Sequence, residues 1–248
     1  MGRALQARRR VKAFLLAGGR GERLRPMTLT MPKCLVPVDG APILGLWLDL
    51  LEQHGIRDVL VNVSQFPEQV ERFVAQRPDG PRVIVVREPE PIGNAGTVAR
   101  HRHFVESDED FWIIYSDNLA MVDLQAMQRF HDGHDGLLTM GLFEAPDPTQ
   151  AGIVVCDDAG RITGFIEKPQ HPVGRLANAG LYLARRALLD AIPRRDGVTD
   201  FGMDVFPALA GQLCGCRLDG VLIDIGTHEG LARATHARAC ARHGGERP

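Results

Sequence analysis

Hydrophobic positions in the first half of the chain fall into short runs separated by segments with helical spacing. The runs predict strands, and the spaced segments predict amphipathic helices. Strands are expected at residues 11–17, 58–63, 82–86, 111–115 and 136–143, and helices at 42–54, 68–76, 95–104 and 123–131. Alternation of this kind favours a mostly parallel sheet with helices on both faces.

The pattern changes after Pro148. Residues 153–156 and 161–166 flank the turn sequence DDAG and predict a β-hairpin. Further strands are expected at 179–184 and 221–224, and helices at 203–213 and 230–242. The second half is therefore predicted to form a small β-rich lobe against the α/β sheet.

The chain contains no internal repeat or low-complexity linker, and its 248 residues suit one large domain. We predict a flexible leader at 1–10 and a single domain at 11–242. Arg8, Arg9 and Arg10 precede the apolar run 11–17, as in a signal peptide, but Gly18 and Gly19 follow where a cleavage site is needed.

Composition excludes several functional classes. A net charge of −2 provides no basic field for nucleic acid, and no apolar run approaches the ~20 residues that span a bilayer. The five cysteines are odd in number and scattered, which argues against a disulfide framework and favours a reducing cytoplasm. Only three of the 29 basic residues are lysines, namely Lys12, Lys33 and Lys168.

The most informative stretch is LLAGGRGERLRPMTLTMPKCLVP, from Leu15 to Pro37. It begins at the carboxyl end of a predicted strand, where open α/β sheets bind ligands, and its glycines allow backbone N–H groups to approach an anion. It lacks the third glycine of the dinucleotide fingerprint, since Leu24 stands there, and the chain has no Gly-Lys pair for a P-loop. A glycine-rich turn with solvated arginines is the alternative.

This stretch resembles the signature GGxGxRLxPxTxxxPKxLxP of the sugar-1-phosphate nucleotidyltransferases (nucleotide-sugar pyrophosphorylases). The matching residues are Gly18, Gly19, Gly21, Arg23, Leu24, Pro26, Thr28, Pro32, Lys33, Leu35 and Pro37. The segments EPEPIGNAGT, YSDN, FIEKP, NAGLYL and DIGTHEGLARA continue the resemblance in family order. It covers residues 11–242 and is greatest for compact mannose- or heptose-1-phosphate guanylyltransferases.

The resemblance implies a Rossmann-like, GT-A-like three-layer αβα fold with a mixed, mainly parallel sheet. Residues 11–148 would form mainly the nucleotide-binding half, and 149–242 mainly the sugar-phosphate-binding half. The implied reaction joins a nucleoside triphosphate to a sugar 1-phosphate and releases pyrophosphate. These two substrates are the expected partners, and a homo-oligomer is possible in this family.

The resemblance also implies individual roles. Arg23 and Lys33 would be catalytic, with Arg23 on the departing pyrophosphate and Lys33 bridging the α-phosphate and the attacking phosphate. The nucleotide-binding residues would be Ala17, Gly18, Gly19, Gly21, Glu88 and Gly93. The sugar-phosphate-binding residues would be Glu167, Lys168, Asn178 and Gly180. A surface ion pair is the alternative for Glu167 and Lys168.

Asp117 and Asp224 each follow an apolar strand, where a buried unpaired carboxylate is costly. Together they favour a Mg²⁺ site, although a turn or a helix cap is the commoner role for either residue alone. Three positions depart from the family pattern: Asn94, Ser116 and His228.

Glu88 suits the adjacent donors of guanine, so GTP is favoured over CTP, dTTP and UTP. A catalytically silent regulatory subunit with the same fold is the alternative of another class. A glycosyltransferase would need a DxD-type motif where this chain has Ser116-Asp117-Asn118.

Overall fold

The computed structural model describes residues 11–193 and 197–243, so the predicted leader at 1–10 lies outside the described residues. Strand β1 (Lys12–Leu16) lies at the centre of the first half and pairs in parallel with β4 (Asp58–Val63) and β6 (Asp110–Tyr115). Strand β5 (Arg82–Arg87) adds to β4, also in parallel. The alternating pattern of the sequence predicted these four strands and their direction correctly.

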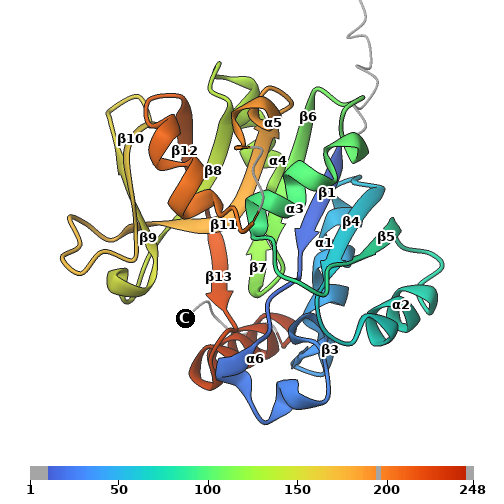
Figure 1. Cartoon of the computed structure of the whole chain (residues 1–248). Coiled ribbons are helices and arrows are strands. Elements are labelled where there is room, and N and C mark those ends of the chain that lie inside the picture. Colours follow the sequence, from blue (N-terminus) through green and yellow to red (C-terminus); the bar gives the residue numbers. More distant parts are fainter. Residues whose placement is uncertain (1–10, 194–196, 244–248) are drawn as a thin grey trace, which may run out of the picture.

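The second half extends the same sheet. Strand β11 (Leu176–Arg185) pairs antiparallel with β6, and β8 (Leu138–Glu144), β12 (Leu213–Arg217), β10 (Arg161–Glu167) and β9 (Gly152–Cys156) follow. The sheet has nine strands in the order β5-β4-β1-β6-β11-β8-β12-β10-β9. Figure 1 shows it from β9 and β10 on the left to β5 on the right. The sheet is therefore mixed, with the predicted β9–β10 hairpin at one edge.

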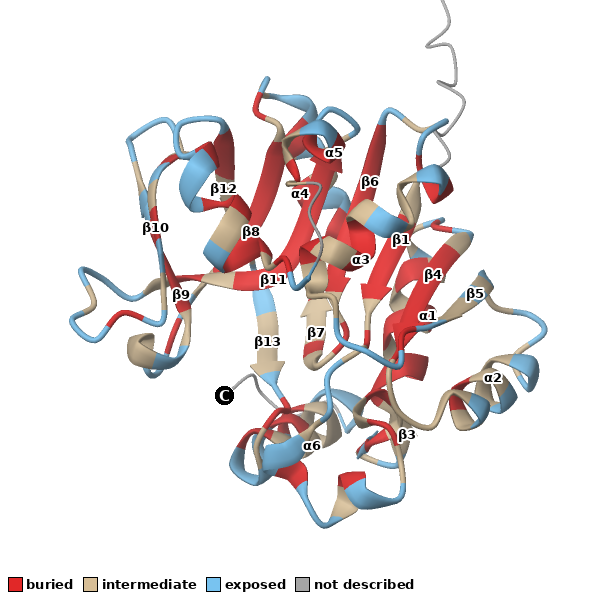
Figure 2. Ribbon diagram, viewed as in Figure 1, coloured by how far each residue is buried: buried red, intermediate tan, exposed pale blue. Residues whose placement is uncertain are grey.

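Helices cover both faces of the sheet, as predicted. They are α1 (Ile43–Gln53), α2 (Pro67–Ala75), α3 (Asn94–Arg100), α4 (Leu124–Asp132), α5 (Leu188–Ala191) and α6 (His228–Arg242). Alternate residues of β1 enter different cores: Leu15 packs with Trp47 of α1, whereas Phe14 packs with Val98 of α3. Figure 2 shows the buried strands between these layers.

Two short ribbons lie outside the main sheet. Strand β7 (Asn118–Val122) pairs with β13 (Gly220–Asp224), with Asp224 opposite Asn118. Strand β2 (Pro37–Val38) pairs with β3 (Ala41–Pro42) and begins where the glycine-rich stretch Leu15–Pro37 ends. The β7–β13 ribbon brings a segment of the second half next to the end of β6.

The predicted helix at 203–213 is wrong. A single π-helical turn covers Phe201–Val205, a 3₁₀ turn covers Pro207–Leu209, and β12 begins at Leu213. Pro207 lacks the N–H that a continuing helix needs, and Asp200 starts the turn by accepting from the N–H groups of Gly202 and Met203. The predicted helix at 95–104 also divides, because α3 ends at Arg100 and a 3₁₀ turn follows.

All five cysteines are free thiols. Among residues 11–193 and 197–243, no helix has both the length and the apolar character needed to cross a membrane.

Candidate active site

The carboxyl ends of β1, β4 and β6 meet at one edge of the sheet, because Leu16 of β1 is in register with both Asn62 and Tyr115. Asn62 of β4 and Ser64, just after β4, bond to the loop that leaves β1. The Ala17 N–H donates to Asn62 Oδ1 at 2.8 Å, and Ser64 Oγ donates to the Gly18 carbonyl at 2.7 Å. A Cβ on Gly18 would lie 2.7 Å from Asn62 Nδ2, so the close approach needs glycine.

The loop continues as three consecutive 3₁₀ turns, at Glu22–Leu24, Met27–Leu29 and Lys33–Leu35. Gly21 begins them with a φ of 63°, and its carbonyl accepts from Thr28 Oγ1 at 2.7 Å. Leu24 and Cys34 are buried, so the loop has its own anchors in the core. The loop is therefore attached to the core at several points, while Arg20, Arg23 and Arg25 are exposed, as the alternative of a turn with solvated arginines also expects.

Four charged side chains gather beside this loop. Lys33 Nζ lies 2.6 Å from Asp117 Oδ2, and its side chain is only 11% exposed. Arg23 lies 3.9 Å from Asp224 in a more exposed pair. A Cβ on Gly226 would lie about 3 Å from Asp224, Arg23 and Lys33 at once, at 2.7, 2.9 and 3.1 Å. The structure therefore brings the predicted catalytic and metal-binding residues together.

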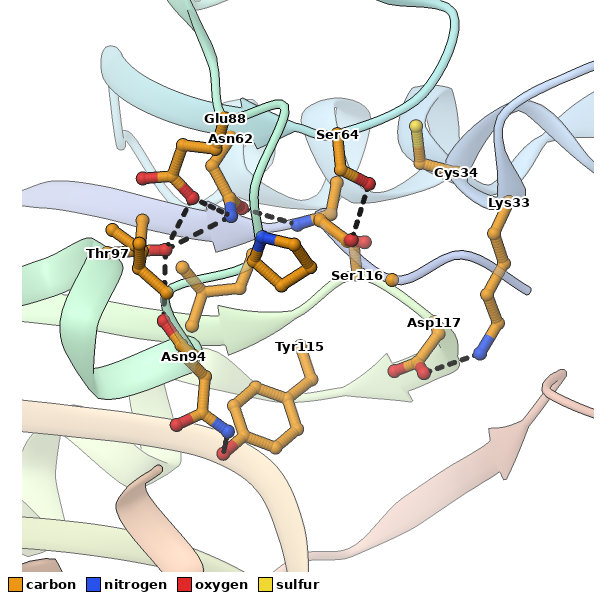
Figure 3. A pocket seen from close by; sticks show the side chains of 17 residues that line it. Lys33, Cys34, Asn62, Ser64, Glu88, Asn94, Thr97, Tyr115, Ser116 and Asp117 are labelled. Atoms are coloured by element: carbon orange, nitrogen blue, oxygen red, sulfur yellow. Dashed lines mark hydrogen bonds and ion pairs between the residues drawn. The ribbon is translucent and has the colours of Figure 1, made fainter. Parts of the chain in front are cut away.

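A cavity of about 270 Å³ opens beside this cluster (Figure 3). This volume is near the lower end of the ~300–1,000 Å³ typical of ligand pockets. Seven predicted site residues line it: Ala17, Gly18, Gly19, Lys33, Glu88, Gly93 and Asp117. Polar residues that were not predicted also line it, namely Asn62, Ser64, Thr97 and Tyr115. Asn62 could have been found from the sequence, because a single asparagine inside the apolar strand VLVNV indicates a buried polar role.

Glu88 lies at the floor of the cavity and is only 3% exposed. Its Oε2 accepts from Asn62 Nδ2 and Thr97 Oγ1, both at 2.8 Å, and Oε1 lies 3.3 Å from His101 Nε2. Burial lowers the pKa of His101, while Glu88 acts in the opposite direction. A direct contact between Glu88 and a base stays a prediction. The described contacts give Glu88 another role, which is to hold Asn62 beneath the loop.

Gly93 has a φ of 81°, and a Cβ there would lie 2.2 Å from the Thr199 carbonyl oxygen. The role of Gly93 in nucleotide binding stays a prediction. The structure gives a reason of its own for the missing side chain, since the backbone of Thr199 already fills that space.

Glu167 is the last residue of strand β10, and Lys168 follows it. The Glu167 carboxylate lies between two glycines, because a Cβ on either Gly152 or Gly202 would come within 2.7 Å of Oε2. Burial there raises the pKa of Glu167. Lys168 has a φ of 44°, an uncommon value for a residue with a side chain, and its ammonium lies 3.8 Å from Glu167.

Asn178 and Gly180 lie on β11, next to β6. The Asn178 amide donates to the Tyr182 hydroxyl at 2.7 Å, and its carbonyl accepts from the Gly180 N–H at 2.9 Å. Gly180 has a φ of 66°, and a Cβ there would lie 2.9 Å from the Tyr115 ring. The two predicted sugar-side residues are therefore close to the cavity residue Tyr115.

The three departures from the family pattern have distinct surroundings. Ser116 is buried, and its N–H donates to the Leu16 carbonyl. His228 is exposed at the first position of α6, where Nε2 donates to the Arg25 carbonyl at 3.0 Å. Asn94 bonds to Tyr115 and Asp200.

Comparisons with known proteins agree with this architecture. The putative glucose-1-phosphate thymidylyltransferase of Bacillus anthracis superposes with a TM-score of 0.82 at 24% identity, over 91% of this chain and 94% of that one. HddC from Yersinia pseudotuberculosis, solved with GMP-PN, superposes with a TM-score of 0.76 at 23% identity, over 91% of this chain and 98% of that one. These likenesses confirm the fold.

Curated relatives include a mannose-1-phosphate guanyltransferase beta-A of Xenopus laevis, 36% identical over 222 residues and 87% of this chain. A probable mannose-1-phosphate guanylyltransferase of Arabidopsis thaliana is 33% identical over 226 residues and the same share of this chain. The chain spans 61% and 62% of the length of these two relatives. The family model described as nucleotidyl transferase matches residues 12–239. The chain belongs to the nucleotidyl transferase family.

Proposed function

We propose that this protein transfers a nucleoside monophosphate from a nucleoside triphosphate to a sugar 1-phosphate. The observation that carries the proposal is the convergence of Lys33, Arg23, Asp117 and Asp224 beside the cavity at the end of β1. Two cations and two carboxylates at a glycine-rich loop suit a reaction between phosphates, in which positioning and charge neutralisation do most of the work.

In the proposed reaction, an oxygen of the sugar phosphate attacks the α-phosphorus of the triphosphate. A new P–O bond forms there as the bond to the β-phosphate breaks, and pyrophosphate leaves with the bonding electrons. The loop at 17–21 would hold the triphosphate, and the Arg23 guanidinium would bind the leaving pyrophosphate. The Lys33 side chain is nearly buried, and its ammonium is a compact point charge. Both properties suit a cation that lies between two phosphates.

Asp117 and Asp224 fit a divalent cation. Within residues 11–193 and 197–243, no group of three or more His, Cys, Asp or Glu side chains is arranged to hold a metal. Two carboxylates alone are typical of Mg²⁺ sites that phosphate oxygens and water complete. Such a cation, when bound, would neutralise phosphate charge. The Lys33 ammonium now pairs with Asp117, so the carboxylate is not left with an unbalanced charge in the free protein.

Glu167 and Lys168 would bind the sugar 1-phosphate. The raised pKa of Glu167 follows from burial, and such a carboxylate is well placed to accept from sugar hydroxyls that replace water. Lys168 is 63% exposed and free to reach a phosphate. Asn178 and Gly180 would border the same sugar from β11.

For the substrates, we propose GTP and mannose 1-phosphate or a related hexose or heptose phosphate. Support comes from the names of the curated relatives and from the structure of HddC with GMP-PN. The same reaction with CTP, dTTP or UTP is the alternative, and the thymidylyltransferase likeness favours none of the four bases.

The test is a panel of the four nucleoside triphosphates against several sugar 1-phosphates, with pyrophosphate release as the readout and Mg²⁺ present. We expect release with at least one pair and the highest kcat/KM with GTP. A higher kcat/KM with a pyrimidine triphosphate would exclude the guanine preference but not the reaction. No release with any pair, alongside ligand binding in thermal shift, would favour a silent regulatory subunit.

A further inference from the structure

Asn94 is the first residue of α3, and its side chain contacts two other segments of the chain. Its Nδ2 lies 2.8 Å from the Tyr115 hydroxyl and 2.6 Å from Asp200 Oδ2, and its Oδ1 accepts from the Phe201 N–H at 2.7 Å. Tyr115 ends β6 in the first half, whereas Asp200 and Phe201 belong to the second. A single side chain thus holds two segments that are more than 80 residues apart in sequence.

Backbone hydrogen bonds also join residues 92–96 to Thr199, and we call this contact between residues 92–96 and 199–202 the junction. The Thr199 N–H donates to the Ile92 carbonyl at 2.9 Å, and the Thr199 carbonyl accepts from Ala95 and Gly96, both at 3.1 Å. Thr199 is buried, and Gly93 packs directly against it. The loop that borders the cavity and the segment at 199–201 are therefore one structural unit.

The junction reaches the sugar side by two routes. Gly202 follows Phe201, and a Cβ there would lie 2.7 Å from Glu167 Oε2, so the segment touches the predicted sugar carboxylate. The second route passes through two packed rings. The rings of Tyr115 and Tyr182 lie edge to face with centroids 5.6 Å apart, and the Tyr182 hydroxyl accepts from Asn178. Figure 3 shows Asn94 pointing toward Tyr115 at the wall of the cavity.

We infer that Asn94 is a positioning residue that couples the nucleotide subsite to the sugar-phosphate subsite. This inference rests on the proposed function for the identity of the two ligands. Ordering of the loop at 92–96 by a bound nucleotide would order 199–202 through Asn94, and Glu167 would then meet the sugar in a fixed position. Each ligand therefore tightens the binding of the other, by the same factor in both directions.

The experiment measures that factor. The dissociation constant of the accepted sugar 1-phosphate is determined with and without a saturating α,β-methylene analogue of the accepted triphosphate. We expect the analogue to tighten sugar-phosphate binding in the wild type by about ten-fold, within the usual range of such coupling. In Asn94→Ala and in Tyr115→Phe, we expect the factor to fall to within about two-fold of unity. Asn94→Ala removes three hydrogen bonds and Tyr115→Phe removes one of the same three, and the net loss of a single hydrogen bond is enough for such a change.

Two further variants separate coupling from loss of stability. Asp123→Ala removes the N-cap of α4, away from the cavity. It should lower the stability of the fold, as the loss of an N-cap does, without touching the junction. It should leave the factor unchanged. The double variant Asn94→Ala with Tyr115→Phe should be no worse than the more affected single variant, because both break one network.

An unchanged factor in Asn94→Ala and Tyr115→Phe would overturn the inference, as would a wild type in which the analogue leaves sugar-phosphate binding unchanged. Either result is distinct from failure of the proposed function, in which no pair of substrates gives pyrophosphate. Additive effects in the double variant would also contradict it, since the two side chains would then act separately.

Discussion

At the scale of single residues, Lys33 is the side chain whose chemistry is most constrained. Its ammonium lies 2.6 Å from Asp117, and a Cβ on neighbouring Gly226 would lie 3.1 Å from Nζ. The planar guanidinium of an arginine at this position is larger than the ammonium and would crowd Asp117 and Gly226. We therefore predict that Lys33→Arg folds, still binds a triphosphate and loses about 10²-fold in kcat, because a shift of ~1 Å in a reacting group has that effect.

Lys12 provides the matched control. It is also a lysine of low exposure, but it bonds to the Phe104 carbonyl and Asp108. Lys12→Arg should keep its kcat. Kinetics with saturating substrates would decide, and a normal kcat in Lys33→Arg would mean that another cation serves the reaction.

Lys168 tests a different property, which is backbone strain. Its φ of 44° costs a residue with a side chain about 1 kcal/mol or more, and glycine does not incur this cost. We predict that Lys168→Gly unfolds at a higher urea concentration than Lys168→Ala, while both variants have a raised KM for the sugar 1-phosphate. Equal urea midpoints would indicate that the positive φ is not strained.

The sequence located most of the residues that gather at the candidate site, and it missed others for physical reasons. Lys33, Arg23, Asp117 and Asp224 were found because each stands in a local pattern. Asn62 and Tyr115 were missed, since their roles depend on strands that pair only in the folded sheet. The contact between Gly93 and Thr199 was also missed, because Thr199 is distant in sequence.

At the scale of elements, α4 and β8 share a hydrogen-bond chain that fixes two histidines. The Gly136 N–H donates to His134 Nδ1, so the proton of neutral His134 is on Nε2, which lies 2.7 Å from Thr139 Oγ1. Thr139 in turn lies 2.8 Å from Nδ1 of the buried His131. A proton on His134 Nδ1 would break the first bond of this chain.

Burial, followed by neighbouring His131 and the cations Arg185 and Arg161, lowers the pKa of His134 to about 4, and Asp135 opposes the shift. The unfolded chain has an ordinary histidine pKa of about 6.5 and binds the proton first. Stability is therefore complete above about pH 6.5 and falls as the pH drops toward 4. We predict that the urea midpoint of the wild type decreases between pH 7 and pH 5 by more than that of His134→Gln. Parallel curves for the two proteins would show that His134 is not the titrating group.

Helices and strands were predicted correctly where the period of their own residues determines the secondary structure. The main-sheet strands of the first half and helices α1, α2 and α4 agree with the structure because each has a clear period and clear ends, whereas the predicted helix at 95–104 ends early at Arg100. Strand β12 was missed, since LCGCR has little β-branched character and is held by pairing with β8. The wrong helix at 203–213 had an apolar pattern, but Pro207 and the Asp200 cap divided it.

At the scale of the whole molecule, the two proposed metal ligands come from different halves. Asp117 follows β6, Asp224 ends β13, and the Ile225 N–H donates to the Asp117 carbonyl at 2.9 Å. We predict that Asp117→Ala and Asp224→Ala each abolish turnover while the fold is kept. The melting temperature should fall more in Asp117→Ala, because it leaves the nearly buried Lys33 without its partner.

The exposed Arg23–Asp224 pair should contribute at most ~1 kcal/mol. Thermal unfolding with and without Mg²⁺ and triphosphate would check both variants. Near-normal pyrophosphate release by either, or no effect of a chelator on the wild type, would exclude the two-carboxylate site.

The pairing of strand β11 with β8 is irregular between Asn178 and Tyr182. Asn178 pairs with Leu142 and Tyr182 with Met140, so β11 has two more residues than β8 over this stretch. Because two is an even number, the side chains on either side of the irregularity still face the correct cores. The core would therefore tolerate a chain shortened by these two residues. The extra length contains Gly180, so a chain shortened there would fold into a more regular sheet and lose the backbone that we propose borders the sugar.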